Sequence, residues 1–381
     1  MPEKFESQPN PEKEPLERKW IENAEGVFEL KQTKTETSDS DFKTMFDRVI
    51  GGKSEEERIG AKEDLQKRLE QPIRADIKEH EIPLTERDRK IIKSTESAVD
   101  KIVTYYGGKP KRIKPENIGV VSQGAIATIT EGRLRGGMYS SLGQKVIVEK
   151  NESDVDLATV LAHELFHFKA YKSAKITKEG DIKSYRSGIA VSDREKEVEY
   201  LVEIEEAIIA KVVRKFYEEE IRNNPLFADE VLKTDKVKDW IKKSMQMRDW
   251  DENKSQFMLD EIYSMPESDK MLEVLEKKDF KGYKGKNLEE FKIGYVDGCL
   301  KRLIEKDKVV LSERYREREK LNKIMQEILE KSKGKFKDKK EIFDEFTKAH
   351  FSGNLLPLAR IVESALGKGS FRKMAEDSKR E

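Results

Sequence analysis

The chain has 381 residues, enough for two or three domains, and 36% of them are apolar, enough to build at least one substantial core. Its 76 basic residues balance 76 acidic ones, so the formal net charge is zero and attraction to nucleic acid is not expected. The single cysteine, Cys299, cannot form an internal disulfide, and there is neither a signal peptide nor an apolar run of about 20 residues. These features predict a cytoplasmic protein with no membrane partner, in which Cys299 is a small buried residue.

Four segments follow along the chain. Residues 1–40 are rich in Pro, Glu, Lys, Ser and Thr, which predicts a disordered polar tail. Residues 41–84 predict an N-terminal helical segment, in which Ser54 caps a helix. Residues 85–222 mix helical and strand patterns, and residues 223–381 read almost entirely as helices, so we expect a C-terminal helical domain.

The mixed segment begins with an amphipathic helix that Gly107 and Gly108 end. Short runs rich in β-branched residues then predict strands within 117–122, 125–131 and 145–150. Ser153, with an acid three residues later, predicts the start of the next helix. Beyond it, residues 184–192 could form a strand or loop, and a long helix is expected over about 193–222. The fold class is therefore α+β, with a small mixed sheet and extensive additional helical regions.

The chemistry is concentrated in the stretch "HELFH", which holds two of the four histidines of the chain. Residues four apart share one face of a helix, so His163 and His167 can bind the same ion. Glu164 is offset by about 100 degrees, which suits it to hold a water bound to the metal instead of ligating the metal. Two histidines and one further ligand would leave zinc an open position, where water loses its proton near pH 7. Glu164 would then act as the general base.

In a capped, largely uncharged helix that follows a strand, this motif resembles the active-site helix of the zincin metallopeptidases. The resemblance covers roughly residues 85–220 and implies a minimal zincin-like catalytic domain with one zinc ion. The branch of zincins with a third histidine is excluded, because Ala170 and Ser173 occupy its last two fixed positions. The gluzincin branch takes a glutamate from a later helix, often before Ala or Gly. Glu206-Ala207 matches that pattern and makes Glu206 the expected third ligand.

Helical periodicity disagrees in part, because the apolar stripe of this later helix is centred nearer Glu205 than Glu206. A carboxylate in the middle of an apolar face is costly unless it is paired or bound to metal, so Glu205 stays the alternative third ligand. In thermolysin-like zincins another acid, four residues after the ligand glutamate, orients the first histidine. This chain has Ala210 at that position, so some other group must do so or the metal is bound less tightly.

The sequence thus predicts a zinc-dependent metallopeptidase that acts on a peptide or protein substrate. An extended peptide could pair with an edge strand within 136–150, and Tyr185 or Arg186 could supply a transition-state donor. The alternative is a catalytically inactive zincin-like module that binds metal or a protein partner, which Ala210 favours. The other two histidines, His80 and His350, are expected to be structural or exposed.

Overall fold

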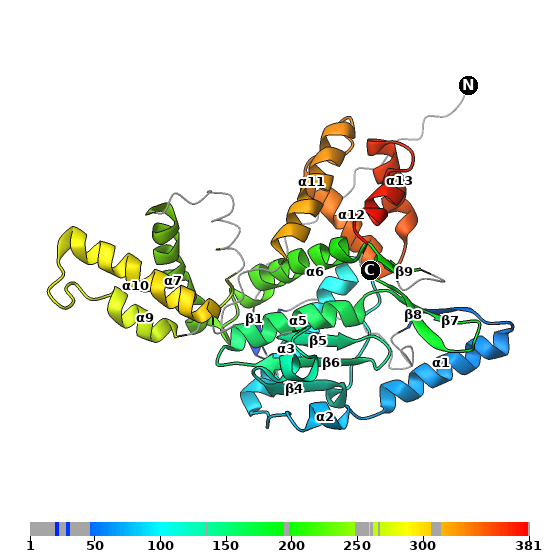
Figure 1. Cartoon of the computed structure of the whole chain (residues 1–381), viewed down its shortest axis with the longest axis horizontal. Helices are drawn as coiled ribbons and strands as arrows, with labels where there is room; N and C mark the ends of the chain where they lie inside the picture. The colour runs from blue at the N-terminus through cyan, green and yellow to red at the C-terminus, as the bar shows by residue number, and fades with distance from the viewer. Residues whose placement is uncertain are drawn as a thin grey trace.

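The structure is a computed structural model that describes residues 20–22, 28–30, 46–134, 136–193, 198–247, 259, 262–265, 267–305 and 314–379. Its fold is α+β, as the sequence predicts, with small sheets beside many helices (Figure 1). No helix within those ranges has both the length and the apolar character needed to cross a membrane.

A three-stranded mixed sheet lies directly beneath the helix that carries "HELFH". Its order is β4-β6-β5, with β4 (Ile118–Ser122) parallel and β5 (Gly137–Ser140) antiparallel to the central β6 (Lys145–Lys150). Within the described residues β5 pairs on one side only, so its other edge is available for hydrogen bonding.

A second sheet of five strands has the order β10-β9-β8-β7-β3. Most of its pairs are antiparallel, but β3 pairs in parallel with β7. Its strands are β3 (Arg48–Gly51), β7 (Lys172–Ile176), β8 (Ile182–Ser187), β9 (Ala190–Ser192) and β10 (Glu199–Tyr200). A separate antiparallel pair joins β1 (Trp20–Glu22) to β2 (Phe28–Leu30).

Three helices pack against one another: α3 (Glu86–Tyr105), α5 (Asp154–Lys169) and α6 (Val202–Phe216). A π-helical turn over Tyr217–Ile221 continues α6. The other helical elements are α1 (Glu55–Glu70), α2 (Ala75–Lys78), the 3-10 turn Pro115–Asn117, α4 (Ala125–Ile129), α7 (Ala228–Met247), α9 (Ser268–Leu275), α10 (Gly285–Glu305), α11 (Tyr315–Lys331), α12 (Lys339–Ser352), α13 (Leu355–Leu366) and α14 (Ser370–Glu376).

The predicted starts and ends of helices are confirmed where a capping side chain or a glycine determines them. The hydroxyl of Ser54 accepts a hydrogen bond from the Glu57 amide at the start of α1, and Ser153 accepts one from the Asp156 amide at the start of α5. After α3, Gly107 takes a positive φ of 75°, a conformation that favours glycine and ends the helix.

Other local predictions are wrong. The run at 125–131, expected as a strand, forms the short helix α4, because Gly124 begins a helical turn before it and the amide of Ile126 bonds the Glu149 carboxylate. The segment 41–84 contains the helices α1 and α2, as expected, but residues 48–51 form β3 instead of helix, because they pair with β7 from far along the chain. The long helix expected from about 193 begins at Val202, because β10 precedes it.

Within the tail expected to be disordered, residues 20–22 and 28–30 form the β1–β2 pair. The remainder of residues 1–40 lies outside the described residues.

One apolar core joins the central helices to the end of the chain. It contains buried residues of α3, α5, α6, β4 and β6 together with residues of α11, α12, α13 and α14. Figure 1 shows α11, α12 and α13 gathered above α6 on the side away from the three-stranded sheet. The last helices therefore complete the core in which α5 and α6 are held.

A second core is formed by α7, α9 and α10, which project to the left in Figure 1. Its buried residues include Val237, Leu272 and Cys299, and Cys299 is 3% exposed, as the sequence predicts. Two smaller apolar clusters form among the described residues, one around Ile77 and Ile126 and one around Val49 and Leu65. The domain boundaries expected from the sequence stay a prediction.

Phe346 of α12 is fully buried in the core that the last helices share with α5 and α6, and this position allows a prediction. Phe346→Ala should lower the free energy of unfolding by about 3–5 kcal/mol, because it removes a large apolar side chain and leaves a cavity. Urea denaturation followed by circular dichroism measures this. Leu356→Ala, at a position that is 56% exposed, is the control and should change stability by no more than about 0.5 kcal/mol. Equal effects of the two substitutions would contradict the packing described here.

Candidate metal centre

Helix α5 is fixed in position before it presents any functional group. At its start, the Glu230 carboxylate of α7 accepts hydrogen bonds from the Asp154 and Val155 amides, which also places negative charge at a helix N-terminus. Along its length, Leu161, Leu165 and Phe168 are fully buried. This packing fixes the rotation of α5 about its own axis. The face of α5 opposite these buried side chains therefore points toward α6.

That face brings the predicted ligands together. The Nε2 atoms of His163 and His167 lie 3.2 Å apart, and Glu206 Oε2 of α6 lies 3.7 Å from the first and 3.5 Å from the second. Among the described residues this is the one group of three or more His, Cys, Asp or Glu side chains arranged to hold a metal ion. The His163 side chain is 22% exposed, so the cluster is open to solvent on that side.

The three atoms fit a zinc ion. Donors about 2.0–2.1 Å from a tetrahedral zinc ion lie about 3.3 Å from one another, close to the 3.2, 3.5 and 3.7 Å separations found here. Two imidazole nitrogens and one carboxylate oxygen form a donor set that zinc accepts and that leaves a fourth position for substrate or water. In addition, Glu206 Oε2 is buried and has no hydrogen bond, and its charge is compensated only by the ion pairs it makes, among them that with Arg314 Nη1 at 2.8 Å. The assignment of these residues as ligands stays a prediction.

Glu205, the alternative ligand, lies on the other side of His167. Its Oε1 is 3.6 Å from His167 Nδ1, and its Oε2 accepts a hydrogen bond of 2.8 Å from the Ala190 amide. An ion bound by both Nε2 atoms could not also reach a carboxylate that faces Nδ1. Glu205 is therefore placed to orient His167, the kind of support that a metal-bound histidine needs from its second nitrogen.

This arrangement bears on the missing acid at Ala210. Ala210 is buried in α6 and offers no polar side chain, so it cannot orient His163. Glu205 supplies a carboxylate from the same helix, but it acts on the second histidine of the motif and not on the first. The tautomer that keeps the His167 Nδ1 proton leaves Nε2 free to bind an ion.

Glu164 lies beside the cluster against the edge strand β5. A Cβ atom added to Gly137 of β5 would be 2.6 Å from Glu164 Oε1, so only glycine leaves room for this carboxylate. Burial raises the pKa of Glu164 to about 7, in the range that suits a group exchanging protons at neutral pH. Sequence reasoning did not find Gly137, although the Gly136-Gly137 pair was a visible signal.

The three expected ligands have strongly coupled charges. Burial, followed by the charge of His167, lowers the pKa of His163 to about 3. Burial also disfavours charge on His167, but Glu206 and then Glu205 outweigh it and raise its pKa to about 10. Despite its own burial, Glu206 has a pKa far below the usual range, chiefly because of His167 and Arg314. An ion that binds both His167 and Glu206 must therefore displace a proton from His167.

Two cations near the cluster were not found from the sequence. Arg314 Nη1 lies 2.8 Å from Glu206 Oε2, an ion pair outside hydrogen-bond geometry, and its charge favours the ionised form of Glu164. Lys172 is fully buried, and its ammonium donates to the His167 carbonyl and to Ser187 Oγ. Lys172 follows closely after α5, whereas Arg314 is far from both helices in the chain. No motif in the sequence marks either residue, so the three-dimensional packing identifies them.

The donors considered from the sequence are used elsewhere. The Arg186 guanidinium donates to the carbonyls of Gly188 and Gly353, both at 2.7 Å, and stacks on the ring of Tyr171. It therefore ties β8 to the end of α12 and is not free to face the cluster. Tyr185 is partly buried on the same strand, with Lys175 near its ring.

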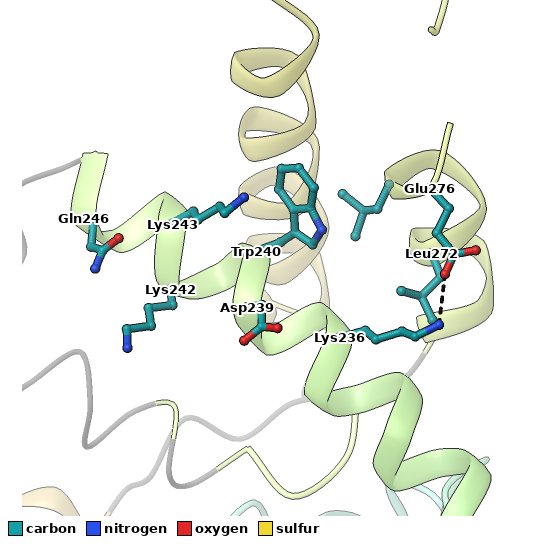
Figure 2. Close-up of a pocket in the computed structure, with 9 residues that line it drawn as sticks. Lys236, Asp239, Trp240, Lys242, Lys243, Gln246, Leu272 and Glu276 are labelled. Carbon is teal, nitrogen blue, oxygen red and sulfur yellow. Dashed lines mark hydrogen bonds and ion pairs between the residues drawn. The ribbon is translucent and has the colours of Figure 1, made fainter. Parts of the chain in front are cut away.

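A surface hollow of about 520 Å³ lies away from the cluster, on the part of the molecule formed by α7 and α9 (Figure 2). Trp240 stands in it with the Lys243 ammonium 4.3 Å from its ring. Lys236 is paired with Glu276 at 3.0 Å and Lys243 with Glu289 at 3.2 Å, so these charges are already compensated. The hollow contains none of the residues of the candidate metal centre.

Comparison of the chain with protein-family models, with curated proteins and with solved structures gives no match.

The position of Glu205 generates a prediction. Glu205→Gln should weaken zinc binding about 10- to 100-fold, because the neutral amide no longer holds the His167 Nδ1 proton as a carboxylate does. Competition with a chelator of known zinc affinity measures the change. Glu203→Gln is the matched control, since Glu203 lies two residues away and pairs with Lys320 at 2.7 Å. Unchanged zinc affinity in Glu205→Gln would contradict an orienting role.

Proposed function

We propose that the chain is a zinc-dependent metallopeptidase of the zincin class, and of the gluzincin type. The observation that carries the proposal is the trio of His163, His167 and Glu206, whose ligand atoms have the spacing of a zinc site. The charges of His167 and Glu206 also act on Glu164, the buried residue that follows His163. His163 and His167 would be ligands through Nε2, and Glu206 through Oε2. One zinc ion per chain is expected.

When bound, zinc supplies a Lewis acid that polarises a peptide carbonyl and makes water acidic enough to attack near neutral pH. The rest of the work belongs to the protein. Glu164, buried and with a pKa raised to about 7, takes the proton of the attacking water and passes it to the amine that leaves. Glu205 keeps His167 in one orientation through Nδ1.

The substrate would be a peptide in extended conformation. Strand β5 has an edge without a partner within the described sheet, and Gly137 brings that edge against Glu164. An extended peptide that adds to this edge would have its backbone held beside the general base. This arrangement supports hydrolysis of peptide bonds over hydrolysis of compact small molecules.

A zincin-like module that binds metal or a protein partner without cleavage is the second candidate. Ala210 favours it, because the acid that orients the first histidine in thermolysin-like members is absent. Glu205 can orient His167 but does not replace the missing acid at His163. One measurement distinguishes the two candidate functions. A folded, zinc-loaded protein that cleaves no member of a broad peptide library would support the binding module and contradict the peptidase.

The metal site itself is tested by metal analysis. Purified protein should contain about one zinc ion per chain, and His163→Ala and His167→Ala should each lose it, because two remaining ligands hold zinc poorly. His80→Ala serves as the control, since His80 is outside the cluster. A folded wild-type chain that neither contains zinc nor binds it when titrated would overturn the proposal.

The role of Glu164 is tested separately from metal binding. Glu164→Gln should retain zinc and lower the rate of peptide hydrolysis by about 100- to 10,000-fold, the usual contribution of a general base. Zinc content and turnover of the same preparation are the two measurements. Turnover equal to that of the wild type would exclude Glu164 as the base.

A further inference from the structure

His350 is a buried histidine without a hydrogen bond. It lies on α12 and is 0% exposed, and neither of its ring nitrogens has a hydrogen bond of good geometry, although the backbone of Phe166 lies close enough to favour its charged form. The sequence predicts a structural or exposed residue at this position, and the structure shows that it is not exposed. Buried polar atoms are nearly always paired, so an unpaired imidazole in a core calls for an explanation.

The surroundings of His350 connect it to the metal centre. Its Nδ1 lies 4.0 Å from Oε1 of Glu205, the same oxygen that faces His167 Nδ1 at 3.6 Å. Glu205 is itself 3% exposed, and its other oxygen is held by the Ala190 amide. The carboxylate therefore lies between an imidazole of α5 and an imidazole of α12.

The backbone approaches His350 and Glu205 closely at Gly188. A Cβ atom added at Gly188 would be 2.1 Å from His350 Nδ1 and 3.1 Å from Glu205 Oε1, and Gly188 has a φ of 55°. The Tyr171 amide donates a hydrogen bond of 3.2 Å to the backbone carbonyl of His350. The Phe351 ring packs edge-on against the imidazole, with 4.6 Å between the two ring centroids. The ring is thus held against Glu205 by close packing.

We propose that His350 is a positioning residue of the metal centre, which holds Glu205 against His167 and so makes helix α12 part of the site. The inference rests on the proposed zinc centre. A shift of about 1 Å would bring the His350 Nδ1–H into hydrogen-bond range of Glu205 Oε1. With Oε2 held by Ala190, that bond would fix the oxygen that receives the proton of His167.

The inference has a reciprocal consequence. If His350 strengthens zinc binding through Glu205, zinc must in turn stabilise the packing of His350, because coupling between two sites is symmetric. The last helices of the chain would then do more than complete the core. They would respond to the metal although none of their residues touches it.

Two substitutions of similar length separate positioning from packing. His350→Gln keeps an N–H donor, whereas His350→Met fills the space without one. Zinc affinity of the full chain is measured by chelator competition, and the melting temperature is measured with and without zinc. His350→Met should weaken zinc binding about 10-fold or more and reduce the stabilisation by zinc, whereas His350→Gln should stay within about 3-fold of the wild type. His80→Gln is the control and should change neither quantity.

A purely structural role predicts a different result. His350→Met would then lower the melting temperature equally with and without zinc and leave zinc affinity unchanged, which would overturn the inference while the zinc site stands. A folded wild type that binds no zinc would overturn the proposed function and this inference together. If His350→Met does not fold, hydrogen exchange of the wild type decides. Zinc should slow exchange of amides near His350 in α12, and exchange unaffected by zinc in a chain that binds it would contradict the coupling.

Discussion

The candidate site depends on one constraint, the burial of the apolar face of α5. Leu161, Leu165 and Phe168 are fully enclosed, and a helix packed in this way cannot rotate without opening the core. The opposite face then presents His163 and His167 to α6, while Glu164, beside the buried stripe, meets β5. In this packing the two imidazole Nε2 atoms lie 3.2 Å apart.

The two adjacent glutamates of α6 divide between the two nitrogens of His167. Neighbouring residues on a helix point about 100 degrees apart, so one carboxylate enters the apolar interior and the other reaches the edge of the buried face. Glu205, 3% exposed, meets Nδ1, while Glu206, with a side chain 15% exposed, meets Nε2. Periodicity placed Glu205 at the centre of the apolar stripe, and the dipeptide resemblance selected Glu206. Periodicity and the dipeptide indicate different glutamates because each glutamate contacts a different nitrogen of the same histidine, His167.

The parts that could be predicted are those that short stretches of sequence determine. The caps at Ser54 and Ser153, the stop at Gly107, and the shared face of His163 and His167 follow from interactions within four residues. The failures follow from distant contacts. The run at 125–131 has strand composition, but a turn and the Glu149 carboxylate make it helical. Arg314, Lys172 and His350 reach the cluster from other elements, and no spacing in the chain announces them.

The packing behind His167 also determines where an ion can enter. On the Nδ1 side, Glu205, Gly188 and His350 fill the space, and both glutamate oxygens face groups of the protein. On the Nε2 side, the His163 side chain is 22% exposed and Glu206 Oε2 has no hydrogen bond. Arg314 Nη1 already lies 2.8 Å from that oxygen, so a metal ion that binds there must compete with the guanidinium for the carboxylate. Glu164 follows His163 directly and lies against Gly137 of β5, so the edge strand is in contact with the residue next to the cluster.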